Sequence, residues 1–222
     1  MLLISGSHLR ILVMLPSEHI GYVETLNLSV NRVSGVVVGG HQLLDFRSNL
    51  WLHTTSILVS LMALRDEYVD VGIISPPFHD FVILEQQRRT AGGFGAGNPK
   101  YKRVRCCFNV DRHWVTFMIG TITRELPASY LTISKASATT KLSKRAVIEP
   151  LLQFEGMLSC EKVERCKQHD GSSCGVWCIA ILELILIDST LDDCLYKLMP
   201  YLRMRFLYKA IVFVGKESAY ER

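Results

Sequence analysis

The stretch "CKQHDGSSCGVWCIAILELILI" (residues 166–187) passes from a polar, glycine-marked turn directly into a long apolar run, and Cys174 stands at the junction. An apolar run of this length that follows a glycine and two serines is typical of a buried helix. The run is too short, and too broken by Glu183, to span a bilayer. The sequence therefore predicts that Cys174 lies at the N-terminus of a buried helix.

Composition indicates one large globular domain. The chain has 222 residues, of which 49% are hydrophobic, so it can bury a substantial core. The net charge of +4 is modest, and apart from "KYKRVR" (100–105) the basic residues are scattered, which argues against nucleic-acid binding. The 7 cysteines include no C-x-x-C pair, so no metal site is predicted and reduced thiols in an intracellular protein are expected. The apolar start of the chain has no basic stretch of the kind that opens a signal peptide.

The remaining segments predict a mixed α+β domain with a central antiparallel or mixed sheet packed against helices. A glycine-rich segment at 90–102 lacks the strand, loop and helix order of a phosphate-binding loop, so we interpret it as a connection. Period-two patterns predict strands, as where Val115, Phe117 and Ile119 alternate onto one face, and period-3.6 patterns predict helices. The expected elements are short strands in 22–45, a helix in 50–64, a strand ended by two prolines in 69–78, two strands around "DRH" in 104–122, a returning strand in 130–134, a loop and helix start in 135–149, and further helix with a last strand in 191–213.

The residues around Cys174 are those that a nucleophilic cysteine needs. The attacking species is the thiolate, and the unpaired N–H groups of a helix N-terminus favour negative charge there. Gly171 and Gly175 let backbone approach a substrate carbonyl, so the N–H of Cys174 can donate to a developing oxyanion, with the side-chain amide of Gln168 as a second donor. Taken alone, the stretch also fits a structural cysteine, which is the commoner role of a cysteine before an apolar helix.

A nucleophilic thiol also needs a base, and His113 is the best placed of the histidines. It ends a polar turn at the start of a predicted strand and is followed by Trp114. A surface histidine in a turn would have the same local sequence. The residues leave these two interpretations open.

Together, "DRHW" before an apolar strand and "QHDGSSCG" before an apolar helix resemble the Ulp1-type cysteine proteases, the SUMO-specific protease group that also includes adenovirus-type proteases. "LWLHTTSILVSLMAL" (50–64) resembles that family's helix with a leading tryptophan. The resemblance covers roughly residues 45–190, and its most specific part is the spacing of glutamine, cysteine and glycine in "QHDGSSCG". It implies a papain-like fold, with a protease domain in residues 45–222 and residues 1–44 as an N-terminal extension or the start of that domain.

The resemblance also implies roles for individual residues. Cys174 would be the nucleophile, His113 its general base and Gln168 part of the oxyanion hole, with Gly175 directly after the nucleophile. Trp114 and Trp51 would be the aromatic walls that hold the slender Gly-Gly tail of a ubiquitin-like substrate, although Trp51 equally fits a core position on its helix. The expected partner is SUMO or a related modifier. We expect a monomer without cofactor, metal, nucleic acid or membrane.

The sequence departs from the family pattern at the third catalytic residue. The family carries an aspartate on the strand after the histidine strand, where it orients the imidazole. Between Trp114 and His169 there is neither Asp nor Asn, and the expected position falls near Tyr130 to Ser134. Glu125 is the only carboxylate nearby, in a predicted turn. His53 and Thr54 also replace the polar pair expected after Trp51 and Leu52. A modifier-binding protein without turnover and an acetyltransferase on the same scaffold are therefore alternatives.

Overall fold

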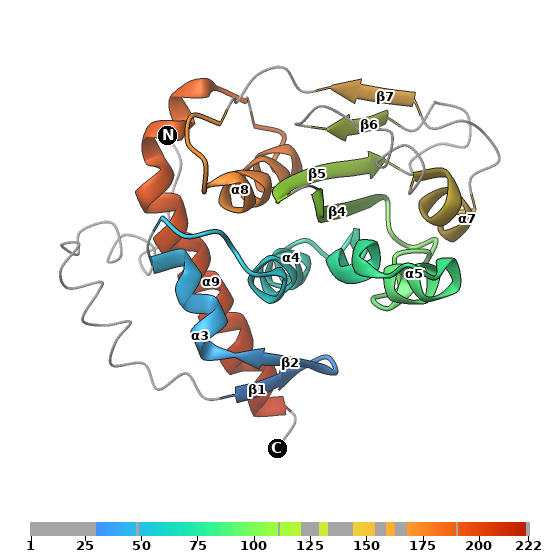
Figure 1. The fold of residues 1–222 in the computed structure, drawn as a ribbon, viewed down its shortest axis with the longest axis horizontal. Helices are drawn as coiled ribbons and strands as arrows, with labels where there is room; N and C mark the ends of the chain where they lie inside the picture. Colours follow the sequence, from blue (N-terminus) through green and yellow to red (C-terminus); the bar gives the residue numbers. More distant parts are fainter. Residues whose placement is uncertain are drawn as a thin grey trace.

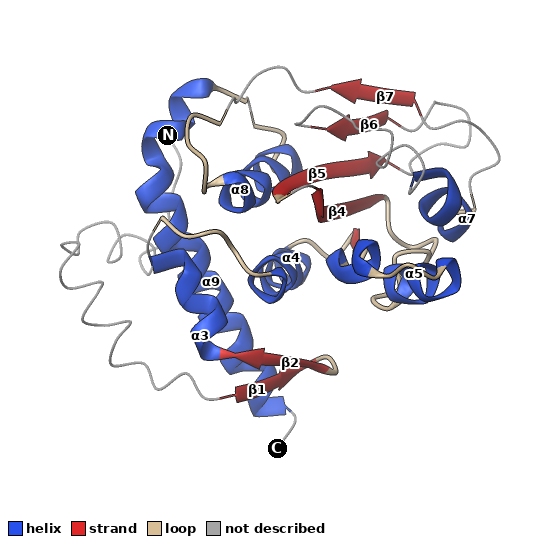
Figure 2. Cartoon of the chain, in the orientation of Figure 1, coloured by secondary structure: helices blue, strands red, loops and turns tan. Residues whose placement is uncertain are grey.

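The computed structural model describes residues 30–47, 49–110, 112–120, 129–132, 144–153, 159–162, 168–189 and 191–220. In these residues a mixed sheet lies beside a group of helices, and a separate hairpin packs near the end of the longest helix (Figure 1). Figure 2 shows the separation of strands from helices.

The sheet has the strand order β3-β4-β5-β6-β7. Its strands are β3 (Val71–Ile73), β4 (Arg103–Val110), β5 (His113–Gly120), β6 (Ser129–Thr132) and β7 (Ser159–Lys162). The two central pairings, β4 with β5 and β5 with β6, are antiparallel, and the two outer pairings are parallel. The predicted mixed sheet is confirmed, as are the two strands around "DRH" and the returning strand as far as Thr132.

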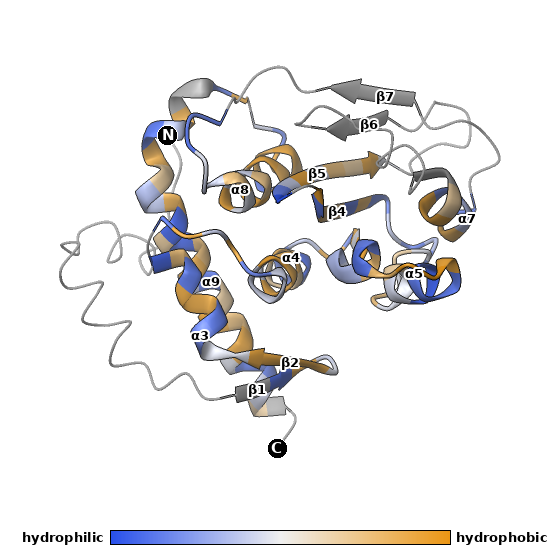
Figure 3. Ribbon diagram, viewed as in Figure 1, coloured by the Kyte–Doolittle hydropathy of each residue, from blue (hydrophilic) through white to orange (hydrophobic). Residues whose placement is uncertain are grey.

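Helices cover both faces of the sheet. The first face carries α4 (Thr54–Glu67), α8 (Cys174–Leu186) and α9 (Met199–Tyr220), which share one core with Trp114 and Met118 of β5. The second carries α5 (Leu84–Gly92), the 3-10 helix Pro76–Asp80, the π-helix Lys144–Ile148 and α7 (Glu149–Leu151). Its core contains Val115, Phe117 and Ile119, the period-two face of β5. Figure 3 shows the apolar colour along both β5 and α8, which agrees with their burial.

The hairpin of β1 (Val30–Val33) and β2 (Val36–Gly39) packs on α9 within the first core. The strands predicted in 22–45 are confirmed for this hairpin, and residues 22–29 lie outside the described residues. The prediction is wrong after Gly39, where α3 (Gly40–Leu43) and a 3-10 helix (Leu44–Arg47) follow. A capping interaction explains the change, because the side-chain oxygen of Gln42 accepts a hydrogen bond from the N–H of Gly39 at 3.0 Å.

Two other predicted boundaries are wrong. The helix expected from residue 50 begins at Thr54, because the Nδ1 of His53 accepts a hydrogen bond from the N–H of Thr55 and caps the helix. Trp51 therefore lies before α4 and not on it. The last strand expected by residue 213 does not form in the described residues, since α9 continues to Tyr220 after the 3-10 helix Asp193–Leu198.

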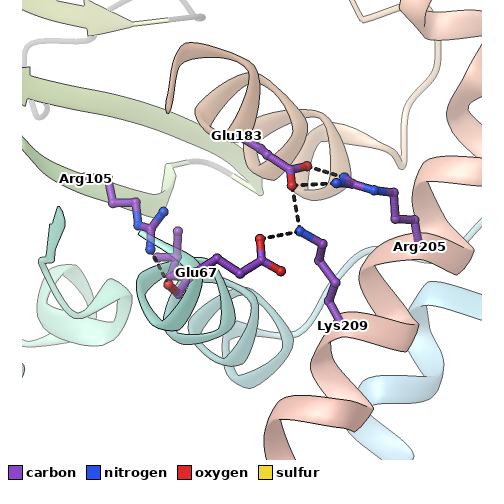
Figure 4. Close-up of polar contacts among 6 residues, drawn as sticks. Glu67, Arg105, Glu183, Arg205 and Lys209 are labelled. Carbon is purple, nitrogen blue, oxygen red and sulfur yellow. Dashed lines mark hydrogen bonds and ion pairs between the residues drawn. The ribbon is translucent and has the colours of Figure 1, made fainter. Parts of the chain in front are cut away.

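A buried ion network joins the three helices of the first face (Figure 4). Glu183 of α8 is 6% exposed and accepts hydrogen bonds from both terminal nitrogens of Arg205 on α9. Lys209, one turn further along α9, bonds Glu183 at 2.7 Å and Glu67 of α4 at 2.6 Å. Burial raises the pKa of Glu183, but the bonds and charges of Arg205 and Lys209 outweigh it and hold the pKa below its ordinary value.

Candidate active site

Trp114 joins the three segments that the sequence analysis singled out. Its indole N–H donates to the carbonyl oxygen of Leu52 at 3.0 Å, which attaches β5 to the segment before α4. Its own carbonyl accepts a hydrogen bond from the thiol of Cys178 at 3.3 Å, and its backbone N–H lowers the pKa of the Cys174 thiol. Since His113 directly precedes Trp114 at the start of β5, the predicted base and the predicted nucleophile come from the strand and the helix that Trp114 connects.

Gly175 makes close packing possible at the start of α8. A Cβ at this position would lie 3.0 Å from the Cδ1 atom of Ile57 and 3.2 Å from two atoms of Leu52. The glycine predicted from the family motif therefore has a structural reason in this chain: it lets the N-terminus of α8 contact the start of α4.

We expect Gly175→Val to lower the free energy of unfolding by about 2–3 kcal/mol, because its side chain would overpack the contact with Leu52 and Ile57. Chemical denaturation followed by circular dichroism measures this loss. Gly171→Ala is the matched control, since nothing lies within 4 Å of a Cβ at Gly171. Equal stability of the Gly175→Val and Gly171→Ala variants would contradict the assignment.

The loop before Cys174 is held by Asp170, a residue that the sequence analysis did not assign. Its Oδ1 atom accepts hydrogen bonds from the backbone N–H groups of Ser172 (3.1 Å) and Ser173 (2.8 Å), and its Oδ2 atom accepts the hydroxyl of Ser173 (2.6 Å). Burial raises the pKa of Asp170, but these bonds hold it well below its ordinary value. The Asp-Gly sequence at 170–171 is a turn signal that could have identified this residue.

Gln168, the predicted oxyanion donor, lies in the same loop. Its side-chain amide donates to the carbonyl oxygen of Asp170 and, at 3.1 Å, to the Oδ1 atom of Asp170. The amide is therefore used within the loop in this structure. A rotation about the side-chain torsions would be needed before it could bond a substrate oxygen.

Cys174 is the first residue of α8 and is 2% exposed. Burial raises the pKa of its thiol, and the negative charge of Asp170 acts in the same direction. Backbone N–H groups of Trp114, Gly175 and Cys174 itself lower the pKa, but burial outweighs them, so the net shift is upward. We expected the helix N-terminus to lower the pKa of the Cys174 thiol, and this prediction is wrong because the pKa is raised. The sequence does not show how deeply the sulfur is buried.

The raised pKa predicts that the Cys174 thiol reacts slowly with alkylating reagents at neutral pH, because little of it is thiolate. We expect the rate of Cys174 alkylation by iodoacetamide to rise with pH along a titration whose midpoint lies above the ordinary cysteine value of about 8.5. Peptide mass spectrometry, with Cys174→Ala as the control for label on other cysteines, measures this profile. A midpoint near neutral pH would show that the thiolate is already formed in the resting protein.

His113 is the first residue of β5, as predicted, and its side chain is exposed. Partial burial of the imidazole lowers its pKa, which favours the neutral ring that can accept a proton. Among the described residues, no side chain hydrogen-bonds this ring. Thr132, the last described residue of β6, pairs with Phe117, four residues along β5, so the described part of β6 does not come level with His113. Residues 133–134, where the family acid was also expected, and Glu125 lie outside the described residues.

The two tryptophans lie in different surroundings. Trp51 is 45% exposed, whereas Trp114 is 3% exposed and belongs to the first core. The alternative that Trp51 is a core residue on its helix is wrong, because the helix begins after it. With the indole of Trp114 buried and bonded to Leu52, only Trp51 offers an open aromatic face beside the segment that Trp114 anchors.

Over the described ranges, no three histidine, cysteine or acidic side chains gather closely enough to bind a metal ion. None of the helices there is both long and apolar enough to span a bilayer. The chemistry available in the described site is that of a thiol, an imidazole and backbone N–H donors.

The chain matches no protein-family model and no curated protein in sequence. Its fold, in contrast, matches solved structures. The SUMO protease Ulp1 with its catalytic cysteine oxidised to a sulfinic acid has a TM-score of 0.66 at 12% identity, covering 90% of this chain and 99% of that one. The Ulp1 protease domain in complex with Smt3, the yeast ortholog of SUMO, has a TM-score of 0.66 at 14% identity, with 88% and 95% covered.

A third structure, the Xanthomonas campestris effector XopD bound to ubiquitin, has a TM-score of 0.51 at 16% identity, covering 72% of this chain and 92% of that one. The predicted papain-like α+β fold is thus confirmed: the chain has the fold of Ulp1 SUMO protease domains, over nearly their whole length.

Proposed function

We propose that this protein is a cysteine-type peptidase or isopeptidase that cleaves after the C-terminal glycine of a ubiquitin-like modifier. One observation carries the proposal: the start of α8, where Cys174 lies, packs against the start of β5, where His113 lies, because the thiol of Cys178 donates to the carbonyl oxygen of Trp114 at 3.3 Å. The fold shared with Ulp1 protease domains, one of them in complex with Smt3, supports the same class of substrate.

The reaction begins from a neutral thiol and a neutral imidazole. His113 takes the proton from Cys174, and the sulfur attacks the carbonyl carbon of the terminal glycine. The backbone N–H of Cys174 stabilises the resulting oxyanion, with Gln168 as a second donor after its amide rotates. The imidazolium then returns its proton to the leaving amine, which leaves a thioester on Cys174. Water, deprotonated by His113, hydrolyses that thioester and restores the thiol.

The substrate class follows from the surroundings of the thiol. Cys174 is almost fully buried, so a bulky side chain next to the scissile bond would not reach it. A Gly-Gly tail has no side chains to exclude, and the exposed indole of Trp51 offers a flat surface for its backbone. This favours a ubiquitin-like modifier over an ordinary peptide.

Ubiquitin-like proteins that carry a C-terminal vinyl sulfone test the proposal. We expect one member of a panel that includes SUMO and ubiquitin to form a covalent adduct with the wild-type chain, visible as a mass increase in a denaturing gel. The Cys174→Ala variant should form none. An adduct that survives Cys174→Ala, or the absence of any adduct with the wild-type chain, would reject the proposal.

A second candidate function is modifier binding without turnover. It is favoured by His113, whose ring N–H donates to no side chain among the described residues, and by the lack of Asp or Asn between Trp114 and His169. Loss of the orienting carboxylate costs a serine protease about four decades in rate. Hydrolysis of a modifier fused through its C-terminal glycine to a fluorophore separates the two candidates. Turnover that disappears in His113→Ala supports the peptidase, and tight binding without turnover supports the second candidate.

A further inference from the structure

Arg203 lies beside the nucleophile although it comes from α9, 29 residues after Cys174 in the sequence and outside every motif that predicted the site. It is 3% exposed. One terminal nitrogen, Nη2, donates to the hydroxyl oxygen of Ser173 at 3.1 Å and to the carbonyl oxygen of Ser172 at 3.5 Å. These are the two residues that directly precede Cys174.

The other terminal nitrogen reaches the segment before α4. Nη1 of Arg203 donates to the carbonyl oxygen of Leu50 at 3.1 Å and to that of Asp45 at 3.4 Å. Leu50 is the neighbour of the exposed Trp51. A single planar guanidinium therefore connects the loop before Cys174 with the segment that carries the exposed Trp51. The guanidinium can bond both segments because its N–H donors point in fixed, separate directions, and the flexible ammonium of a lysine would not reproduce this geometry.

The hydroxyl of Ser173 stands between two opposite charges. It donates to the carboxylate of Asp170 at 2.6 Å and accepts from Arg203, which has no acceptor of its own. In these two bonds the hydroxyl therefore donates toward Asp170 and accepts from Arg203. Ser173 itself is fully buried. The pair places one negative and one positive charge next to Cys174.

These two charges act on the thiol in opposite directions. The carboxylate of Asp170 opposes the thiolate of Cys174, and the guanidinium of Arg203 attracts it. Burial lowers the pKa of Arg203, while Asp170 and Cys174 raise it, and at neutral pH an arginine keeps its charge. Among the described residues, the titratable or charged groups that interact with the Cys174 thiol are Asp170 of the loop, Cys178 of α8 and Arg203 of α9. Tyr196, of the 3-10 helix before α9, interacts with Asp170 and Arg203.

We propose that Arg203 is a positioning residue for the nucleophile: its guanidinium fixes the loop that carries Cys174 and supplies the positive charge against which the thiolate forms. The proposal rests on the role of Cys174 in the proposed function. It assigns to α9 a part in the reaction that no motif around the cysteine or the histidine contains.

The test is the pH profile of Cys174 alkylation by iodoacetamide in the full chain, with fragment ions assigning the label to Cys174. We expect Arg203→Gln to move the midpoint upward by about one pH unit, a roughly tenfold loss of rate at neutral pH. Arg203→Lys keeps the charge but not the fork of donors, so its midpoint should move upward by clearly less than that of Arg203→Gln. Asp170→Asn keeps an oxygen acceptor for the two backbone N–H groups but loses the charge, so its midpoint should move downward.

Arg205→Gln is the matched control for loss of a buried guanidinium, because Arg205 is two residues further along α9 and pairs with Glu183 instead of the loop. It should lower stability and leave the midpoint unchanged. Circular dichroism confirms that each variant is folded at the temperature of labelling. A wild-type midpoint in Arg203→Gln, the same upward shift in Arg203→Lys, or the same shift in Arg205→Gln would each overturn the proposal.

Alkylation needs no protein substrate, so the two proposals fail separately. If the wild-type chain forms no adduct with any modifier but the midpoints move as expected, the peptidase function is rejected and the role of Arg203 stands. If adducts form at Cys174 and the Arg203→Gln midpoint does not move, the peptidase function stands and Arg203 has only a structural role.

Discussion

Replacing Glu183 by alanine is expected to lower the free energy of unfolding by about 3–5 kcal/mol, because it leaves two partly or fully buried cations without the carboxylate that pairs them. Among the described residues, Arg205 then has no ion pair and Lys209 keeps its ion pair with Glu67. Figure 4 shows that this single carboxylate connects α8 to α9 and, through Lys209, to α4. Urea denaturation at neutral pH measures the loss.

The matched control is Asp66→Ala, which removes a surface ion pair between the same α4 and α9. Asp66 and its partner Lys216 are 44% and 46% exposed, so the loss should stay below about 1 kcal/mol. The pH dependence gives a second check. The pKa of Glu183 is lower in the folded chain than in the unfolded one, so its contribution is present above the unfolded value and is lost as pH falls through the folded value. The difference between wild type and Glu183→Ala should therefore shrink in acid, and a constant difference would contradict this account.

We expect His113→Ala to lower the rate of modifier cleavage by about 10²–10⁴-fold, the usual contribution of a positioned general base. The thiol of Cys174 has a raised pKa, so without the imidazole too little thiolate is present at neutral pH to attack. Single-turnover cleavage of a modifier fused to a fluorophore measures the rate.

His169→Ala is the control for this variant, since His169 is an exposed histidine of the loop before Cys174 and its ring packs against the ring of Tyr196. Its rate should remain within a few-fold of the wild type. Because a larger fraction of Cys174 is thiolate at high pH without the help of a base, raising the pH should restore part of the rate in His113→Ala. Equal rates for the two histidine variants would exclude His113 as the base.

The sequence was most informative where a local pattern coincides with a structural element. The apolar run after Cys174 predicted α8, and the alternation of Val115, Phe117 and Ile119 predicted one face of β5. Both succeed because periodicity reports which side of an element is buried. The start of α4 was harder to predict, because it depends on His53. The ring of His53 caps the helix, and its backbone N–H donates to the carboxylate of Asp45.

The site was predictable only in part, for a related reason. The positions of Cys174 and His113 at the start of α8 and β5 could be predicted, because each stands at the boundary of an element with a local signature, and their catalytic roles stay a prediction. The roles of Trp114 and Arg203 depend on contacts with residues 62 and 30 positions away in the sequence, which no local pattern encodes. The burial that raises the pKa of Cys174 is likewise a property of the whole fold.

The position of α9 in the chain has a consequence for synthesis. α9 follows all other described elements, yet it packs on the hairpin, on α4 and on α8, and its Arg203 reaches the loop before Cys174. Because a ribosome releases the chain from its N-terminus, the hairpin, the sheet and α8 emerge before the helix that covers them. Until α9 is released, the apolar faces of α4 and α8 lack a partner and the nucleophile loop lacks its guanidinium. A nascent chain is thus expected to expose Cys174 before the guanidinium of Arg203 reaches the loop beside it.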